Sequence, residues 1–222
     1  MKTMHLVSAL TLLAPAVAFA DEGIENSGNF DHHVAAPANA LELSVAAGYA
    51  QGGGPIAGDM QHLEDVAGAG GALELAASHR INPTFAVGVY GSLETYATGD
   101  QLDGDTDVLG ATAGIQGIAH LRPERSVDPW VSVGTGWRGL WLSPDQGKTT
   151  ALQGLELARL QVGVDYRLTE NIAIAPVVGG SLGMFVSQDA PMTDGYTELQ
   201  DKKVNFVGFA GLAGRFDLGG RR

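Results

Sequence analysis

The stretch LELSVAAGYA at residues 41–50 decides the fold, because large apolar side chains alternate in it with small or polar ones. Side chains of a β-strand point alternately to the two faces of the sheet, so this strand has one apolar face and one polar or small face. In a transmembrane barrel the apolar face contacts lipid and the other face lines the lumen. A soluble ligand-binding barrel packs its apolar face inside. The same phase recurs in later strands, with charged residues on the inward side, and this favours the membrane barrel.

Eight such stretches are present, and most have the roughly 9 to 11 residues that a tilted strand needs to cross a bilayer. The predicted strands cover residues 41–50, 72–81, 85–96, 108–122, 130–142, 157–168, 172–186 and 204–218. Short turns at residues 82–84, 123–128 and 169–171 alternate with long polar loops at 51–71, 97–107, 143–156 and 187–203. The fold class predicted is therefore all-β, an eight-stranded antiparallel up-and-down transmembrane β-barrel. Its even strand count places both ends of the chain and the short turns on the periplasmic side.

Composition agrees with this class. The 222 residues include 32 glycines and are 45% hydrophobic, with a mean hydropathy of +0.06, which is too apolar for a disordered chain. Beyond the N-terminus no apolar run is long enough for a spanning helix, and a membrane protein without such helices must be a closed barrel. The formal net charge of −12 argues against nucleic acid as a partner. The absence of cysteine excludes a lipid-anchored lipoprotein and a disulfide scaffold.

The chain divides into four parts. Residues 1–20 have one lysine, a short apolar core and a small-x-small ending, and are predicted to be a secretory signal peptide. Residues 21–40 show no periodicity and are predicted to be a disordered periplasmic lead-in. Residues 41–218 form the predicted barrel, and residues 219–222 form a short tail.

Charged side chains on the inward phase predict two groups of ion pairs in the lumen. Arginine is favoured over lysine there, because its planar guanidinium pairs bidentately with carboxylates. The group expected at the periplasmic end is Glu42, Arg80, Arg122, Asp165, Arg167, Arg215 and Asp217. The group expected nearer the outer end is Glu74, Glu94, Arg138 and Arg159. We expect these pairs to hold the barrel together, because the interior of an eight-stranded barrel is normally filled by side chains; a gate or an ion path is the alternative.

Inward glycines leave that alternative open. In the predicted register ten glycines point inward: Gly48, Gly88, Gly110, Gly114, Gly134, Gly136, Gly163, Gly179, Gly183 and Gly211. They could leave water-filled space between the two charged groups, or they could relieve crowding in a tightly curved sheet. Two irregularities are also expected: a bulge or local distortion at Pro176, and a late start of the sixth strand, because the apolar phase slips at residues 155–159.

Signals for chemistry are weak. Four aspartates at residues 100–107 do not have the spacing of a helix-loop-helix calcium site, so we interpret them as a solvated acidic loop. The adjacent His32 and His33 make a poor metal site, and Ser78 and His79 point to opposite faces. His120 is inward and is expected to pair with charged neighbours. We therefore predict no catalytic residue, no cofactor and no metal, and no enzymatic activity.

The strand layout resembles that of the small eight-stranded outer-membrane β-barrel families of Gram-negative bacteria, which include the outer membrane protein A barrel and the outer membrane protein W type. The turn-containing segments at residues 80–85 and 166–171 and the final glycine-rich strand, which ends Arg215-Phe216-Asp217-Leu218, carry the resemblance. The resemblance implies a monomer in the Gram-negative outer membrane that contacts membrane lipid and lipopolysaccharide and is inserted by the barrel assembly machinery.

The function expected is a structural or surface-interaction role, with the outer loops presented to the medium. One alternative is a narrow, porin-like pore for small polar or apolar solutes. Another is a lipid-modifying barrel enzyme that depends on His120.

Overall fold

The structure is a computed structural model, and it describes residues 36–221 except 59–60, 103–105 and 191–194. The predicted signal peptide and residues 21–35 of the predicted lead-in lie outside the described residues. None of the helices in the described part of the chain is long and apolar enough to span a membrane.

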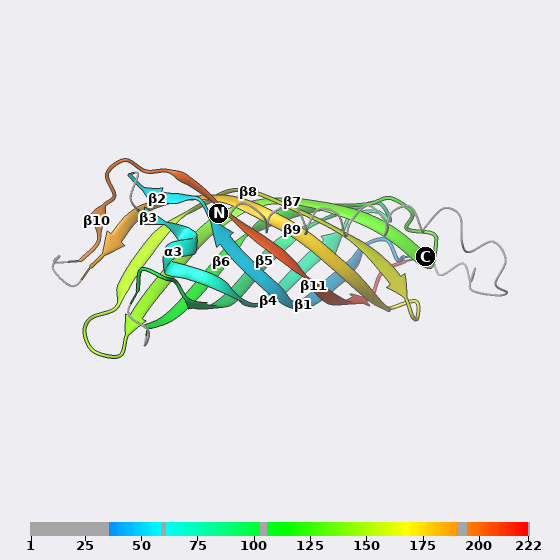
Figure 1. The fold of residues 1–222 in the computed structure, drawn as a ribbon. Helices are drawn as coiled ribbons and strands as arrows, with labels where there is room; N and C mark the ends of the chain where they lie inside the picture. Colours follow the sequence, from blue (N-terminus) through cyan, green and yellow to red (C-terminus); the bar gives the residue numbers. More distant parts are fainter. Residues whose placement is uncertain (1–35, 59–60, 103–105, 191–194, 222) are drawn as a thin grey trace. The chain divides into compact units, whose positions relative to one another are not determined.

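Eight long antiparallel strands close into a barrel, which confirms the predicted fold class (Figure 1). The strands are β1 (Ala40–Gly53), β4 (Ala67–Arg80), β5 (Phe85–Thr98), β6 (Thr106–His120), β7 (Val127–Pro144), β8 (Thr150–Arg167), β9 (Ile172–Asp189) and β11 (Val204–Leu218). Each pairs with its neighbours along the chain, and the pairing of β1 with β11 closes the ring. Short elements lie between β1 and β4 and between β9 and β11: β2 (Pro55–Ala57), β3 (Gln61–His62), α3 (Leu63–Val66) and β10 (Thr197–Glu198).

The predicted phase of the side chains is found in the structure. Leu73, Val89 and Ile115 point outward and are 46%, 56% and 63% exposed, whereas the charged side chains of the same strands are largely buried inside the barrel. Without a bilayer such an exterior would be unstable in water, because many large apolar side chains lie on it. The outer surface is therefore the lipid-facing one.

The strands are longer than predicted. β7, β8 and β9 each have 18 residues, and β4 begins at Ala67 instead of residue 72. Backbone pairing continues into segments whose polar composition suggested loops, because a ladder needs only extended backbone on both strands and tolerates polar side chains outside lipid.

The expectation of a late start for the sixth strand is wrong. β8 begins at Thr150, and its register with β9 shifts between Glu156 and Ala158, which marks a β-bulge. A bulge adds one residue to one strand and so reverses the side-chain phase beyond it. At Pro176 the register is the same on both sides, but the ladder with β8 is interrupted between Val177 and Ile174, the local distortion that proline causes by lacking an N–H.

The end of the barrel with the short turns, here called the turn end, is crossed by both ends of the described chain. The N–H of Ala36 donates to the carbonyl of Pro123 (2.8 Å), and Ala38 and Arg221 exchange two backbone hydrogen bonds of 2.8 Å. Gly220 has φ +95°, and a Cβ there would lie 2.8 Å from the carbonyl oxygen of Ala38, so only glycine fits this crossing. Residues 36–40, the last five of the predicted lead-in, are thus packed against the barrel.

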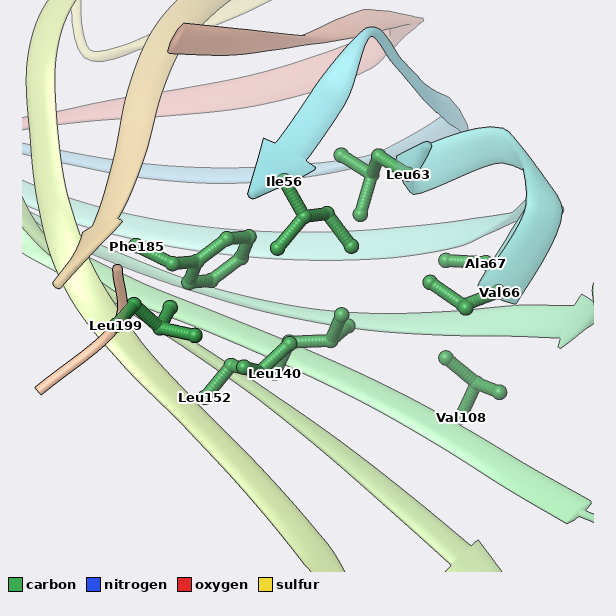
Figure 2. Close-up of a cluster of buried hydrophobic side chains, with 9 residues drawn as sticks. All are labelled: Ile56, Leu63, Val66, Ala67, Val108, Leu140, Leu152, Phe185 and Leu199. Carbon is green, nitrogen blue, oxygen red and sulfur yellow. The ribbon is translucent and has the colours of Figure 1, made fainter. Parts of the chain in front are cut away.

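The opposite end, here called the loop end, is covered by an apolar cap. Ile56, Leu63 and Val66 come from the segment between β1 and β4 and are at most 6% exposed. Figure 2 shows them facing side chains of the barrel wall, including Leu140 and Phe185. The cap is joined to neighbouring loops through backbone hydrogen bonds from Gly58 to Asp201 and from Gln101 to Asp65. The segment predicted as a plain polar loop is therefore a folded lid with an apolar underside.

We expect the cap to be separable from the barrel. Leu63→Ala should cost the cap about 2 to 5 kcal/mol, because truncating a buried leucine removes its burial and leaves a cavity. Faster proteolysis of residues 51–71, with unchanged heat-modifiable migration of the barrel on detergent gels, is the result that checks this. Leu157→Ala on the lipid face, where the side chain is 43% exposed, is the control and should leave proteolysis of the cap unchanged.

Candidate functional site

Eight buried side chains near the turn end form a network, here called the inner group. Its members are Glu42, Arg80, His120, Asp128, Asp165, Arg167, Arg215 and Asp217. Glu42 is central: it accepts hydrogen bonds from Arg80 and from Arg215, the latter at 2.9 Å. Arg167 donates to Asp217 at 2.8 Å, and Arg80 lies 3.6 Å from the same carboxylate. Four strands, β1, β4, β8 and β11, supply these five residues, so the network ties the barrel wall together across the lumen.

His120 belongs to the inner group through both of its ring nitrogens. Its Nδ1 lies 2.7 Å from Asp128 Oδ2. Its Nε2 lies 3.4 Å from Glu42 Oε2 and 3.5 Å from Arg215 Nη1. The inner group thus holds four carboxylates, three guanidinium groups and one imidazole.

One subset of the inner group has the composition of a metal site. Ligand atoms of His120, Asp128 and Asp165 lie within 4.8 Å of one another, the only such group among the described residues. The guanidinium of Arg215 lies 3.4 Å from Asp165 and 3.5 Å from His120 Nε2. Because a cation already occupies the space beside two of the three candidate ligands, this geometry is that of an ion-pair network.

The inward phase predicts Arg122 in this group, but its side chain is exposed at the turn end. The chain leaves β6 at His120, so Arg122 belongs to the turn and no longer follows the inward phase of the strand. Its backbone N–H nevertheless donates to Asp128 Oδ1 at 2.8 Å.

A second network, here called the outer group, lies beneath the cap. It consists of Glu74, Tyr90, Ser92, Glu94, Arg138, Glu156, Arg159 and Gln161. Arg159 donates to Glu74 and stacks on the Tyr90 ring at 4.1 Å. Tyr90 donates to Glu156, and Arg138 lies 3.8 Å from the same carboxylate. Glu94 accepts from Ser92. The structure thus brings together the four residues predicted for this end and adds Glu156, which the sequence placed in a loop.

Little free space remains in the lumen. A chamber of about 60 Å³ lies between the outer group, the cap residue Leu63 and the barrel-wall residue Phe185, enough for a few water molecules. Farther in, beside Trp130 and Arg215, the free space falls to about 10 Å³, which is at most the volume that one water molecule needs. The polar lumen is therefore interrupted between its two ends.

The inward glycines explain why the space is so small. A Cβ on Gly163 would lie 2.5 Å from the Trp130 ring, and one on Gly183 would lie 2.3 Å from Arg138 Nη1. A Cβ on Gly114 would likewise lie 2.6 Å from the Tyr90 hydroxyl. The space beside these glycines is occupied by large lumenal side chains, so the glycines do not leave a water channel.

Comparisons with known proteins agree on the fold. No family model matches the chain, and no curated protein matches it. Neisserial surface protein A has 14% identity and a TM-score of 0.54, over 79% of this chain and 96% of its own. The outer membrane protein AlkL in DMPC bilayers has 13% identity and a TM-score of 0.53, over 89% and 99%. The outer membrane protein OprG of Pseudomonas aeruginosa has 15% identity and a TM-score of 0.50, over 83% and 99%.

At these identities the similarity establishes the fold. Together with the closed ring of strands and the apolar exterior, it defines the chain as a small eight-stranded outer-membrane β-barrel. The outer membrane is accordingly the location of the protein, as the sequence predicts.

Proposed function

We propose that this protein is a closed, electrically silent barrel with a structural or surface-interaction role in the outer membrane. The observation that carries the proposal is the double obstruction of the lumen, by the inner group at one end and by the apolar cap at the other. The two obstructions differ in chemistry. A polar solute meets the apolar underside of the cap, and an apolar solute meets buried charges that would lose their partners if it passed.

Reconstitution of the full protein in planar bilayers tests this proposal. We expect no discrete conductance steps in salt solution, because free space beside Trp130 and Arg215 is only about 10 Å³. Heat-modifiable migration of the same preparation shows that the barrel is folded. Stable, reproducible channels from folded protein would contradict the proposal and favour the pore.

The narrow pore remains a second candidate because of a glycine at the edge of the cap. Gly54, which has φ +90°, lies between the end of β1 and the cap. Glycine at this position allows the segment to pivot, and movement of the cap would open the chamber beneath it. Even then the inner group would block the turn end, so conduction needs two rearrangements.

A lipid-modifying role for His120 has less support. Its side chain is fully buried in the lumen with Asp128 and Glu42 at its two nitrogens, so it does not reach the lipid-facing surface.

A further inference from the structure

Three arginines from two distant parts of the chain lie at the turn end. Arg122 and Arg125 lie on either side of Pro123-Glu124 in the turn between β6 and β7, and Arg221 lies in the tail. Ala36 bonds to Pro123 and Ala38 pairs with Arg221, so a segment only three residues long joins the two sites. All three arginine side chains are exposed, and none forms an ion pair with another described residue. We name this surface the arginine rim.

The height of the arginine rim relative to the membrane follows from the lipid-facing rows. At the turn end these rows finish at Leu121, Leu168 and Leu218, which are 63%, 62% and 51% exposed. Arg122 follows Leu121 directly, and Arg221 lies three residues beyond Leu218, which is about 10 Å at most along an extended chain. The guanidinium groups therefore lie just outside the hydrocarbon, at the level of the phospholipid headgroups.

The charge of this surface is positive, in contrast with the rest of the protein. Glu124 and Glu170 are the acidic residues of the adjoining turns, and Arg222 follows Arg221 in the sequence. Toward the loop end acidic side chains predominate: the lysines Lys148, Lys202 and Lys203 are outnumbered by Glu64, Asp65, Asp100, Asp107, Asp145, Asp189, Glu198 and Asp201. The net charge of −12 therefore does not describe the turn end.

We propose that the arginine rim binds the phosphate groups of anionic phospholipids in the leaflet that surrounds the turn end. Guanidinium groups pair bidentately with phosphate oxygens, and basic residues near a membrane surface are attracted to anionic lipids. The occupant is a lipid because Arg122 directly follows the exposed Leu121, and Phe85, which is 54% exposed, lines a hollow at the turn end together with Pro123 and Glu124. These apolar side chains give the acyl chains of the same molecule a contact beside the arginine rim. This binding is independent of whether the lumen conducts.

Lipid selectivity of the folded protein tests the proposal. The full chain is reconstituted in phosphatidylcholine vesicles, and spin-labelled phosphatidylglycerol and phosphatidylcholine are compared for their fraction immobilised at the protein. We expect phosphatidylglycerol to be preferred about threefold or more at low salt, because the three exposed arginines attract its negatively charged headgroup. The preference should fall as salt shortens the Debye length.

Charge variants at the two ends locate the preference. Arg122→Gln/Arg125→Gln/Arg221→Gln should abolish it, whereas Lys148→Gln/Lys202→Gln/Lys203→Gln, which removes three positive charges near the loop end, should leave it unchanged. The proposal would be overturned if the unmodified protein immobilised the two lipids equally, or if the arginine variant kept the preference for phosphatidylglycerol. It would also be overturned if only the lysine variant lost that preference. Heat-modifiable migration verifies folding. If the triple variant does not fold, Arg125→Gln and Arg221→Gln are measured singly, and each must reduce the preference for the proposal to stand.

Discussion

Glu42→Ala is expected to lower the free energy of unfolding of the barrel by about 3 to 5 kcal/mol, because it leaves buried cations without their carboxylate. Glu42 accepts hydrogen bonds from Arg80 and Arg215 and lies 3.4 Å from His120 Nε2, and its side chain is 2% exposed. Its removal leaves the buried Arg80 and Arg215 without the carboxylate that accepts their hydrogen bonds. Chemical denaturation of the protein in detergent micelles or vesicles, followed by tryptophan fluorescence, measures the loss.

Two further variants separate charge from volume and from location. Glu42→Gln keeps the size of the side chain and removes the charge, so it should recover only part of the loss. Glu124→Ala removes a carboxylate that is exposed at the same end of the barrel and should change the unfolding free energy by less than about 0.5 kcal/mol. A change in Glu42→Ala as small as that of Glu124→Ala would mean that the inner group does not stabilise the barrel.

The fold could be predicted from the sequence because side chains of a barrel strand alternate between the lumen and the lipid. Contact with lipid requires an apolar residue at every second position, and this alternation can be recognised in the sequence. Val89 and Tyr90 are neighbours in β5, yet the first faces lipid at 56% exposure and the second is 4% exposed in the lumen. The same alternation placed Glu42, Arg80 and Arg215 inside the barrel. Inward residues near the same end of the barrel must meet across its narrow lumen, so the sequence also predicts that these three side chains lie close together.

Two carboxylates of these networks, Asp128 and Glu156, lie where that period fails. The sequence predicts a turn at Asp128, but β7 begins one residue earlier, at Val127, and Asp128 Oδ2 lies 2.7 Å from His120 Nδ1. Glu156 lies beside the bulge of β8, where the apolar phase slips, so no pattern pointed to its inward side chain. A strand boundary and a bulge depend on the partner strand, and a single sequence does not contain the register of that pairing.

The cap is not predictable from the sequence for a different reason. Ile56, Leu63 and Val66 are few and widely spaced in a segment that also contains Gly58, Asp65 and His62, and the alternation of a strand is absent. They are buried because they meet Leu140, Leu152 and Phe185 of distant strands. A signal was nevertheless present, since an outer loop that were simply solvated would not need three large aliphatic side chains between Gly54 and Ala67.

The inward glycines could be located from the sequence, but their role could not, because it depends on what lies opposite each one. Gly48 of β1 pairs with Gly211 of β11, and a Cβ on Gly48 would lie 2.3 Å from the carbonyl oxygen of Ala210 and 2.6 Å from the Cα of Gly211. Both atoms are backbone, so neither can move without disturbing the ladder that closes the barrel. Close approach of two strands is a site where glycine in a sheet is required.

Gly48→Val is therefore expected to destabilise the barrel by about 3 kcal/mol or more, at the upper end of the cost of overpacking. Gly117→Val is the matched control, since Gly117 lies on the lipid-facing phase of β6 and a Cβ there meets nothing within 4 Å. Valine is favoured in strands, so this control should be neutral or slightly stabilising. The midpoint of chemical denaturation compares the two variants. Equal losses would show that valine is costly at any glycine of this barrel, and the explanation from strand proximity at Gly48 would be wrong.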